Sequence, residues 1–548
     1  MKRALFVFGL IALLAGLLAT PPAWVWVQRT GGTGECRTTC TLEDSQGRIV
    51  VCGYFSGTVE FGTQTLVASG VRDAFLAQMD SGGNWLWAVQ MGGEGTDYAR
   101  KMTLEANDCI VVGGTFDQSF SLGEYELDNS GQQDFYLARY SSEGNLLEAT
   151  AFGSAEHDVL QGLDVGPGGE INLSGSFRYS LNLGEIALTT PNRGIFIAKL
   201  DEDLNPLWAH AVPNSTGDLE CNNLGTDTAG NIYLTGNFYD YCSFGQPNAI
   251  NLTGDGSCGF AIKLDPSGNG IWGERVGNGY CVISDSYIDP EGYTYLSADV
   301  VMEPFSVNRL DVIPNCAKLG PDGAWVWVDN STNLGACYYV RICGDEQGNC
   351  FLTGSLWDDC SFGDYPLTGS FDEMNIFVGK GDSQGIWQWG IQGYDSSGTL
   401  FANASEIIAS QGDRCVVTGY NNAATLYFGD FVLPPAAQTY SWYIRTHGTT
   451  VANNDPHEIP SPGLVSLYPN PSSEQLRIRP ESGFSTGSTV EIYNLRGQLV
   501  KRFSNLKQDE TELLWDGKDA KGLDCSPGLY FLKVHSSTQS IVKPFTRL

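Results

Sequence analysis

The clearest regularity along the chain is a run of apolar residues that contains a small residue and recurs at nearly constant intervals. The first copy is VVCGYF and the fourth is YLTGNF. The small residues of successive copies are 61, 61, 61, 62, 56 and 65 positions apart. They are Gly53, Gly114, Gly175, Gly236, Ala298, Gly354 and Gly419. A period of this length predicts a repeat architecture with seven units.

Each unit holds further segments with the character of β-strands. A run such as FIAKLD at Phe196 follows the first, and a turn bearing Gly or Asn leads to a strand that usually carries tryptophan, as in WLWAVQ at Trp85. Gly-Asn turns between β-branched and aromatic runs are hairpin signals. The repeats contain no long, glycine-free run with helical spacing. Four antiparallel strands in each repeat predict an all-β fold, a seven-bladed β-propeller.

The two ends of the repeat region complement each other. The last unit has no fourth strand after Trp442–Arg445, and an extra strand, Trp24–Gln28, precedes the first unit. We expect residues 24–28 to close the last blade from outside, because this leaves no open sheet edge at the junction. The predicted propeller therefore covers residues 24–446.

The N-terminal segment, residues 1–23, has the pattern of a secretory signal peptide. Met1-Lys2-Arg3 is followed by an uncharged apolar run, Ala4–Leu18, and then by small residues. This run is shorter than the ~20 residues that cross a bilayer as a helix. No other apolar stretch could do so, and we expect a mature chain without a transmembrane segment.

The C-terminal part differs from the repeats. Residues 447–463 lack apolar periodicity and carry Pro, Asn and Gly, which is typical of a linker. Residues 464–548 then alternate apolar and polar positions in several short runs. This pattern predicts a small C-terminal β-sandwich.

Two stretches resemble known families. The segment Asp227–Gly236 (DTAGNIYLTG), with FAIKLD from Phe260, resembles the SBBP-type bacterial β-propeller repeat. Residues 464–548 resemble the type A C-terminal sorting domain of the type IX (Por) secretion system. The residues that carry this second resemblance are Tyr468, Pro469, Asn470, Pro471, Gly497, Trp515, Asp516, Gly517, Gly528 and Tyr530. It implies the type IX machinery as a partner and a location outside a Gram-negative bacterium, secreted or on the outer cell surface.

Charge narrows the range of ligands. The formal net charge is −32, and residues 24–463 hold 18 Lys and Arg against 54 Asp and Glu. Such a field repels phosphate backbones, so we expect no nucleic-acid partner. A solubilised extracellular surface is the simplest interpretation of this charge.

Cysteine is frequent, with 15 residues, and an exported protein should hold most of them in disulfides. The strand order predicts the bonds Cys221–Cys242 and Cys337–Cys360. There is no CxxC pair and there are five histidines, so no metal site is expected. We also find no phosphate-binding loop, zinc-protease motif or calcium loop, and expect no cofactor.

The loops that lead from one repeat to the next should surround the mouth of the central channel. They carry the candidate ligand contacts Glu94, Asp97, Glu156, His157, Asp158, Asp218 and Glu220. We assign no catalytic residue and favour a non-enzymatic binding propeller with an unknown extracellular ligand, a glycan or a protein. Two alternatives stay open: a polysaccharide hydrolase or lyase using these carboxylates, and a structural surface component.

Overall fold

The computed structural model describes residues 22–213, 219–245, 249–277, 281–300, 316–329, 337–356, 359–369, 375–395, 403–410, 414–421 and 425–446 of the repeat region. In the C-terminal part it describes residues 465–468, 475–480, 489–494, 499–504, 506, 512–526, 528–535 and 540–547. The predicted linker, nearly all of the predicted signal peptide, and Asp218, Pro469, Asn470, Pro471 and Gly497 lie outside these ranges. The chain separates into two compact units, residues 1–449 and 450–548.

All regular structure in the described residues is β-strand. It includes no helix that could cross a membrane. The fold is therefore all-β, as predicted, and its sheets are antiparallel.

Seven sheets of the first unit share one design, in which four strands are hydrogen bonded in order from the centre of the unit outward. The first three consist of β3 (Cys36–Glu43), β4 (Ile49–Phe55), β7 (Asp73–Met79) and β8 (Trp85–Met91); β9 (Tyr98–Leu104), β10 (Ile110–Phe116), β13 (Asp134–Tyr140) and β14 (Leu146–Phe152); and β15 (Val159–Val165), β16 (Ile171–Leu183), β17 (Ile186–Leu200) and β18 (Pro206–Pro213).

The next three follow the same order. They consist of β19 (Glu220–Thr226), β20 (Ile232–Phe244), β21 (Ile250–Leu264) and β22 (Gly270–Val276); β23 (Cys281–Ile288), β24 (Thr294–Val300), β25 (Cys316–Leu319) and β26 (Trp325–Val328); and β27 (Cys337–Gly344), β28 (Cys350–Leu356), β31 (Asn375–Gly381) and β32 (Trp387–Asp395), the last continued by β35 (Leu426–Phe428) and β36 (Phe431–Leu433). The seventh sheet consists of β33 (Asn403–Ser410), β34 (Arg414–Asn421), β37 (Tyr440–Thr446) and β1 (Trp24–Arg29).

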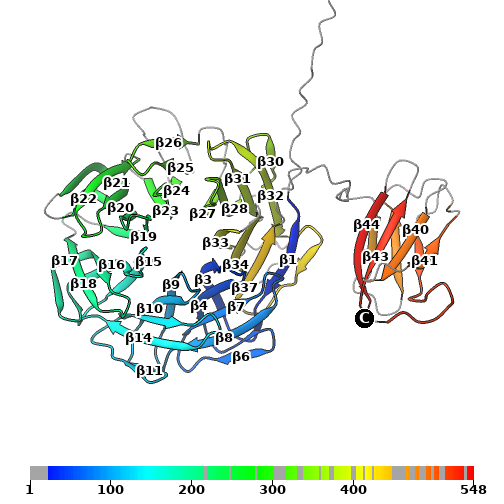
Figure 1. Cartoon of the computed structure of the whole chain (residues 1–548), viewed down its shortest axis with the longest axis horizontal. Helices are drawn as coiled ribbons and strands as arrows, with labels where there is room; N and C mark the ends of the chain where they lie inside the picture. The colour runs from blue at the N-terminus through cyan, green and yellow to red at the C-terminus, as the bar shows by residue number, and fades with distance from the viewer. Residues whose placement is uncertain are drawn as a thin grey trace, which may run out of the picture. The chain divides into compact units, whose positions relative to one another are not determined.

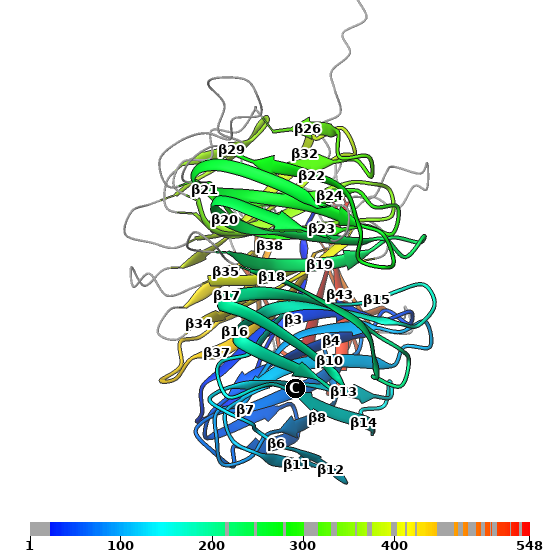
Figure 2. The ribbon, with the colours of Figure 1, turned by 90° about the vertical axis from the view of Figure 1, so that its left-hand side faces the viewer.

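The innermost strands of successive sheets contact one another, from β3 through β9, β15, β19, β23 and β27 to β33, and β33 contacts β3 again. Figure 1 shows the resulting ring of sheets, and Figure 2 shows the third and fourth sheets side by side. Short hairpins lie beside the sheets. They are β5 (Thr58–Phe61) and β6 (Gln64–Val67) with β2 (Gly31–Gly32), β11 (Phe120–Leu122) with β12 (Tyr125–Leu127), and β29 (Cys360–Phe362) with β30 (Tyr365–Leu367).

The recurring glycine has a steric cause. Each innermost strand carries a register shift near its start, as between Thr38 and Cys40 of β3. This irregularity brings a backbone carbonyl against the second strand: a Cβ at Gly53 would lie 2.0 Å from the oxygen of Arg37, and one at Gly236 would lie 2.0 Å from that of Glu220. Glycine therefore recurs at this position because most repeats leave no room for a side chain.

Strands in the middle of each sheet are covered on both faces by neighbouring sheets. In β10 every residue from Ile110 to Phe116 is buried, and so is every residue of β7. Strands buried on both faces read as continuous apolar runs without alternation, which explains the VVGG and VVCG segments in the sequence.

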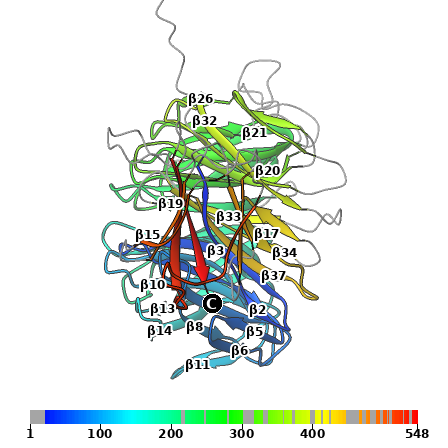
Figure 3. The ribbon, with the colours of Figure 1, turned by 90° about the vertical axis from the view of Figure 1, so that its right-hand side faces the viewer.

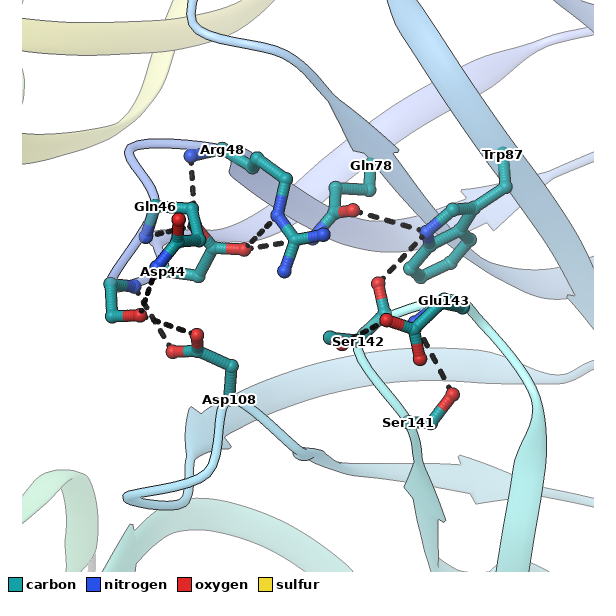
Figure 4. Close-up of polar contacts among 10 residues, drawn as sticks. Asp44, Gln46, Arg48, Gln78, Trp87, Asp108, Ser141, Ser142 and Glu143 are labelled. Atoms are coloured by element: carbon teal, nitrogen blue, oxygen red, sulfur yellow. Dashed lines mark hydrogen bonds and ion pairs between the residues drawn. The ribbon is translucent and has the colours of Figure 1, made fainter.

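Tryptophans of the outer strands join each sheet to the next. Figure 4 shows the indole nitrogen of Trp87 donating to the carbonyl of Ser142, 3.2 Å away, and to Gln78 Oε1. Gln78 in turn donates to Asp44, whose carboxylate also accepts from Arg48. Equivalent bonds run from Trp208 to Pro266 and from Trp272 to Pro321. These tryptophans therefore serve as packing between sheets.

The N-terminal strand belongs to the last sheet. β1 pairs antiparallel with β37, with Val27 opposite Ile444 and Gln28 opposite Tyr443. Figure 3 shows β33, β34 and β37 on the side of the ring where the first strands also lie. The two ends of the repeat region are thus hydrogen bonded within one sheet.

The C-terminal unit contains two sheets. One consists of β38 (Val465–Tyr468), β39 (Leu476–Pro480) and β42 (Leu513–Trp515), and the other of β41 (Leu499–Phe503), β40 (Thr489–Asn494), β43 (Gly528–His535) and β44 (Ser540–Arg547). Side chains of both sheets, among them Ile478, Ile492, Trp515 and Leu532, form one buried hydrophobic cluster. The two sheets therefore share a core of their own.

Candidate functional site

Each innermost strand has one residue, next to its register shift, that occupies the same place in every sheet. Strand pairing identifies this position. It lies opposite the residue that precedes the recurring small residue, as Lys101 lies opposite Gly113 and Asp285 opposite Ser297. The seven residues at this position are Cys40, Lys101, Gly162, Asn223, Asp285, Arg341 and Glu406. Four of them, Lys101, Asp285, Arg341 and Glu406, have carboxylic or basic side chains, which makes this level of the ring polar.

Two cavities follow the axis of the ring. The inner one has a volume of about 310 Å³ and is lined by innermost strands of all seven sheets, including Lys101, Asp285 and Glu406. The other, which we call the mouth, has a volume of about 460 Å³ and includes Arg100, Lys101 and Arg341. Lys101 lines both, so the two cavities adjoin at this side chain. Volumes in this range are typical of small-ligand sites.

Residues within the register shifts of the first five sheets line the mouth. They are Thr39, Arg100, Gln161, Asn222 and Ser284. Because a bulge turns an additional side chain toward the same side of a strand, this irregularity supplies the mouth with polar groups. The geometry that requires the recurring glycine therefore also shapes the site.

Two carboxyl groups of the inner cavity influence each other. Burial raises the pKa of Glu406 well above its ordinary value, and the nearby Asp285 carboxylate raises it further. Burial also raises the pKa of Asp285, against the opposing effect of the Arg341 and Lys101 charges. A carboxyl group whose pKa is raised in this way can keep its proton at neutral pH. Burial raises the pKa of Asp164, in the same cavity, to about 6.

Cys40 lies directly opposite Cys52, and both thiols are buried. A hydrogen bond from Cys52 lowers the pKa of Cys40 to about 7, and the Lys101 charge acts in the same direction. Burial raises the pKa of Cys52 well above its ordinary value. In the described residues, no group of three or more His, Cys, Asp or Glu side chains is placed to hold a metal ion.

Two of the predicted ligand contacts, Asp97 and Asp158, have no exposed surface. Asp97 Oδ2 accepts a hydrogen bond from the backbone N–H of Gly93, 2.9 Å away. Burial raises the pKa of Asp97 to about 7 and that of Asp158 to about 7. The structure places both side chains inside the loop region, away from the residues that line the two cavities.

The other predicted contacts are dispersed. Glu94 and His157 are exposed, and Glu156 accepts a hydrogen bond from Gln132. Glu220 lines the mouth, where it forms an ion pair of 3.1 Å with Arg193. Among the described members of the predicted set, Glu220 is thus the one that the structure brings to the channel.

The structure also places the four cysteines of the two predicted disulfides. Cys221 lies opposite Gly236 in the strand register, and Cys242 is six positions farther along β20. Cys337 and Cys360 belong to one hydrophobic cluster, and Cys221 and Cys242 belong to another. Cys221, Cys242 and Cys360 are free thiols, so the structure contains neither of the predicted bonds.

Sequence reasoning missed Lys101, Asp285, Arg341 and Glu406. Each lies within an innermost strand, where the apolar pattern directs attention to the buried neighbours such as Met102 and Ile407. Aligning the repeats on their recurring small residue places all four of them 13 positions before that residue. This constant offset is the signal in the sequence that could have found them, and the strand pairing across the register shift shows that the positions are equivalent.

Several of the residues that carry the resemblance to a sorting domain are fixed by contacts within the C-terminal unit. The buried Trp515 indole donates to the carbonyl of Lys518, 2.8 Å away, and its ring lies 5.6 Å from that of Tyr530. Asp516 accepts from the backbone N–H of Lys518. Gly517 has a φ of 72°, and Arg547 donates a hydrogen bond to its carbonyl. Tyr468 lies in β38 and Gly528 in β43.

Residues 466–546 match the family model described as the secretion system C-terminal sorting domain. The protein is thus an all-β protein that carries this sorting domain. The domain marks it for type IX secretion to the cell surface or the extracellular space.

Comparisons of the rest of the chain are partial. It is 30% identical over 132 residues to an uncharacterized WD repeat-containing protein of Acanthamoeba polyphaga mimivirus, covering 21% of this chain and 9% of that protein. It is 31% identical over 102 residues to the regulatory protein FlaEY of Caulobacter vibrioides, covering 18% of this chain and 11% of that protein. The chain spans about a tenth of the length of these curated relatives.

Among solved structures, PorZ of Porphyromonas gingivalis, described as a bacterial surface component of the type-IX secretion system, aligns over 94% of this chain and 93% of that chain. The identity is 10% and the TM-score is 0.17. A TM-score this low carries no argument about the function of this protein.

Proposed function

We propose that residues 24–446 form a seven-bladed β-propeller of SBBP-type repeats that acts as a non-enzymatic binding protein outside the cell. In this proposal residues 1–23 are a signal peptide and residues 447–463 a linker. Residues 464–548 form a β-sandwich that hands the chain to the type IX machinery. The ligand binds at the mouth of the channel.

The observation that carries this proposal is the mouth itself. It gathers polar and charged side chains from innermost strands, and it adjoins a second polar cavity at Lys101. Binding sites on rigid elements keep their geometry without an ordering cost. A site of this kind suits recognition of a small ligand or of one unit of a polymer.

The proposal is tested by probing a glycan and extracellular-protein array with the purified full chain and with Ser284→Trp. Ser284 lies at the mouth, and an indole there would fill part of the cavity. Ser121→Trp is the control, since Ser121 is exposed on the peripheral strand β11. We expect binding by the wild type and the control and loss of binding by Ser284→Trp. Equal binding by all three proteins would contradict a site in the channel.

The inner cavity supports a second candidate function, cleavage of a polysaccharide by hydrolysis or by a lyase reaction. Glu406 and Asp285 are neighbouring carboxyl groups with raised pKa values, and such a pair can divide the roles of acid and base. A panel of polysaccharides assayed with wild type, Glu406→Gln and the control Glu274→Gln tests it. Activity that is lost in Glu406→Gln alone would replace the binding proposal with catalysis, and no activity in any protein would remove this candidate.

A further inference from the structure

Three cationic side chains meet at the mouth of an otherwise acidic repeat region. They are Arg100, Lys101 and Arg341. Arg100 donates to Thr115 Oγ1 at 3.0 Å, Lys101 donates to Asn223 Oδ1 at 3.4 Å, and Arg341 donates to the carbonyls of Ser405 and Val340. The acceptors of these hydrogen bonds, all in described residues, are neutral oxygen atoms. The bonds therefore hold the three cationic groups in place without neutralising their positive charge.

Two residues that line the same cavity each have a polar side-chain atom without a hydrogen bond. Gln161 Oε1 and Ser284 Oγ are both buried and have no partner in the structure. Leaving a buried polar group unpaired costs about 1–3 kcal/mol. Both residues line the cavity, so a molecule that enters it can supply the missing partners once these side chains turn toward it. Hydroxyl groups, which donate and accept, fit a glutamine oxygen and a serine hydroxyl equally well.

Arg100 connects the mouth to a pair of tyrosine rings and to one further arginine, Arg72. The rings of Tyr54 and Tyr98 meet edge to face at 4.8 Å, and Arg100 lies 5.3 Å from the centre of the Tyr98 ring. Arg72 lies 5.4 Å from the centre of the Tyr54 ring and forms an ion pair of 3.3 Å with Glu35. Tyr54 and Tyr98 are half-buried. Partly exposed rings of this kind offer an apolar face beside polar groups.

From these observations we infer that the mouth binds a carboxylate-bearing sugar, a hexuronic acid unit of an acidic glycan. This inference rests on the proposed binding function and gives its ligand class. The carboxylate of the sugar faces Lys101, Arg100 and Arg341, and its hydroxyl groups pair with Gln161 and Ser284. The cavity of about 460 Å³ has room for a sugar unit together with ordered water.

The charge balance of the mouth depends on the inner cavity. Three carboxyl groups oppose an anion near Lys101 and Arg341. Glu220 lines the mouth itself and is paired with Arg193, and Asp285 and Glu406 lie in the inner cavity and have raised pKa values. The raised pKa values of Asp285 and Glu406 favour the uncharged forms of these carboxyl groups, which reduces their opposition to the Lys101 and Arg341 charges. The acidic exterior and the cationic mouth therefore differ in sign, and the local field decides which ligand is held.

Calorimetric titration of the full chain tests the inference with three ligands: trigalacturonate, the neutral galactotriose and triglutamate. The trigalacturonate titration is repeated at rising concentrations of sodium chloride. We expect trigalacturonate to bind at least about tenfold more tightly than galactotriose, since hydrogen bonds to charged groups contribute about 1.5–3 kcal/mol. Binding should weaken as salt rises, because ions screen the attraction. Triglutamate should bind weakly, since it lacks sugar hydroxyls.

Variants assign the effect to the site. Lys101→Met and Arg100→Gln should each weaken trigalacturonate binding by about tenfold or more. Arg178→Gln, at an exposed arginine of β16, is the control and should bind as the wild type does. A thermal melt of each variant separates a lost contact from a lost fold, and the salt series on the wild type gives a reading that needs no variant.

The outcomes distinguish this inference from the binding proposal. Equal affinity for trigalacturonate and galactotriose, both lost in Ser284→Trp, would overturn the acidic preference and leave a channel site for neutral sugars. Triglutamate binding as tightly as trigalacturonate would overturn the sugar class. No binding of either sugar by folded protein would overturn the inference, and the array with Ser284→Trp would then decide the binding proposal on its own.

Discussion

The indole nitrogen of Trp26 donates a hydrogen bond to the carbonyl oxygen of Ser81, 3.0 Å away. Trp26 belongs to β1 of the seventh sheet, and Ser81 lies in a turn of the first sheet. Arg445 of β37 donates to the same carbonyl at 3.1 Å and forms an ion pair of 3.0 Å with Glu43 of β3. Two strands of the last sheet, one from each end of the repeat region, therefore bind the same turn of the first sheet.

Deleting residues 24–28 should lower the melting temperature by several degrees. The deletion removes most of β1 and leaves the edge of β37 unpaired. It also removes Trp24 and Trp26, and loss of a packed Trp side chain costs about 3–5 kcal/mol. Calorimetry of the full chain measures the shift. Val25→Ala is the control, because Val25 is 40% exposed, and an unchanged melting temperature in the deletion would contradict the closure role of β1.

Gly144→Ala should destabilise the protein more than Gly169→Ala. Both glycines have positive φ, 80° and 86°, so both variants pay the cost of a left-handed conformation, about 1–2 kcal/mol. A Cβ at Gly144 would lie 2.7 Å from the Trp87 ring, whereas nothing lies within 4 Å of one at Gly169. The collision should add about 1–3 kcal/mol. Denaturant unfolding measures the difference, and equal losses would show that contact with Trp87 is not tight.

Asp97→Asn should stabilise the protein at pH 8 and have little effect at pH 4. The folded-state pKa of Asp97 is raised to about 7 by burial, from an ordinary value of 3.8. The folded protein therefore binds the proton more tightly, and the stability contributed by Asp97 is lost as the pH rises through 7. At pH 8 the gain on removing this ionisation is at most about 4 kcal/mol.

Melting curves between pH 4 and pH 8 measure this trend. Asp201→Asn is the matched control, because the backbone N–H of Asn205 holds the pKa of Asp201 below its ordinary value. This control should show no gain at pH 8. A gain for Asp97→Asn that is the same at every pH would contradict ionisation as its cause.

Removing residues 464–548 should leave the chain in the periplasm of a type IX-competent host, since these residues include the matched sorting domain. Fusing the same residues to an exported reporter should bring the reporter to the surface or the medium. Cell fractionation with immunoblotting follows both proteins. A fused reporter that stays in the periplasm would show that this domain is insufficient for sorting.

Non-reducing peptide mapping should detect no Cys221–Cys242 bond. Cys242 is six positions beyond the residue opposite Cys221, which is on the order of 20 Å at the rise of a strand. A disulfide spans less than about 7 Å between Cα atoms. Detection of a Cys221–Cys242 peptide would mean that β19 and β20 pair in a different register.

Much of the fold could be predicted because the repeat imposes the same demands seven times. The small residue at Gly53 and its equivalents reflect a close approach that recurs within each sheet, and the Trp of the outer strand and the turn glycines reflect contacts between neighbouring sheets. Strand bounds followed from these markers. The positions of Asp97 and Asp158 could not be predicted, because a loop sequence does not show whether a carboxylate faces solvent or the backbone of its own loop.

The sequence by itself determined the all-β repeat, its period and the sorting domain, because these depend on local patterns and on motifs that are contiguous in the chain. Only the tertiary structure decided which side chains share the channel. Lys101, Asp285, Arg341 and Glu406 come from four sheets, and the register shift of each innermost strand sets which residue faces the axis. A shift of one residue reverses the face that a side chain occupies, so the site depends on pairing that no single strand encodes.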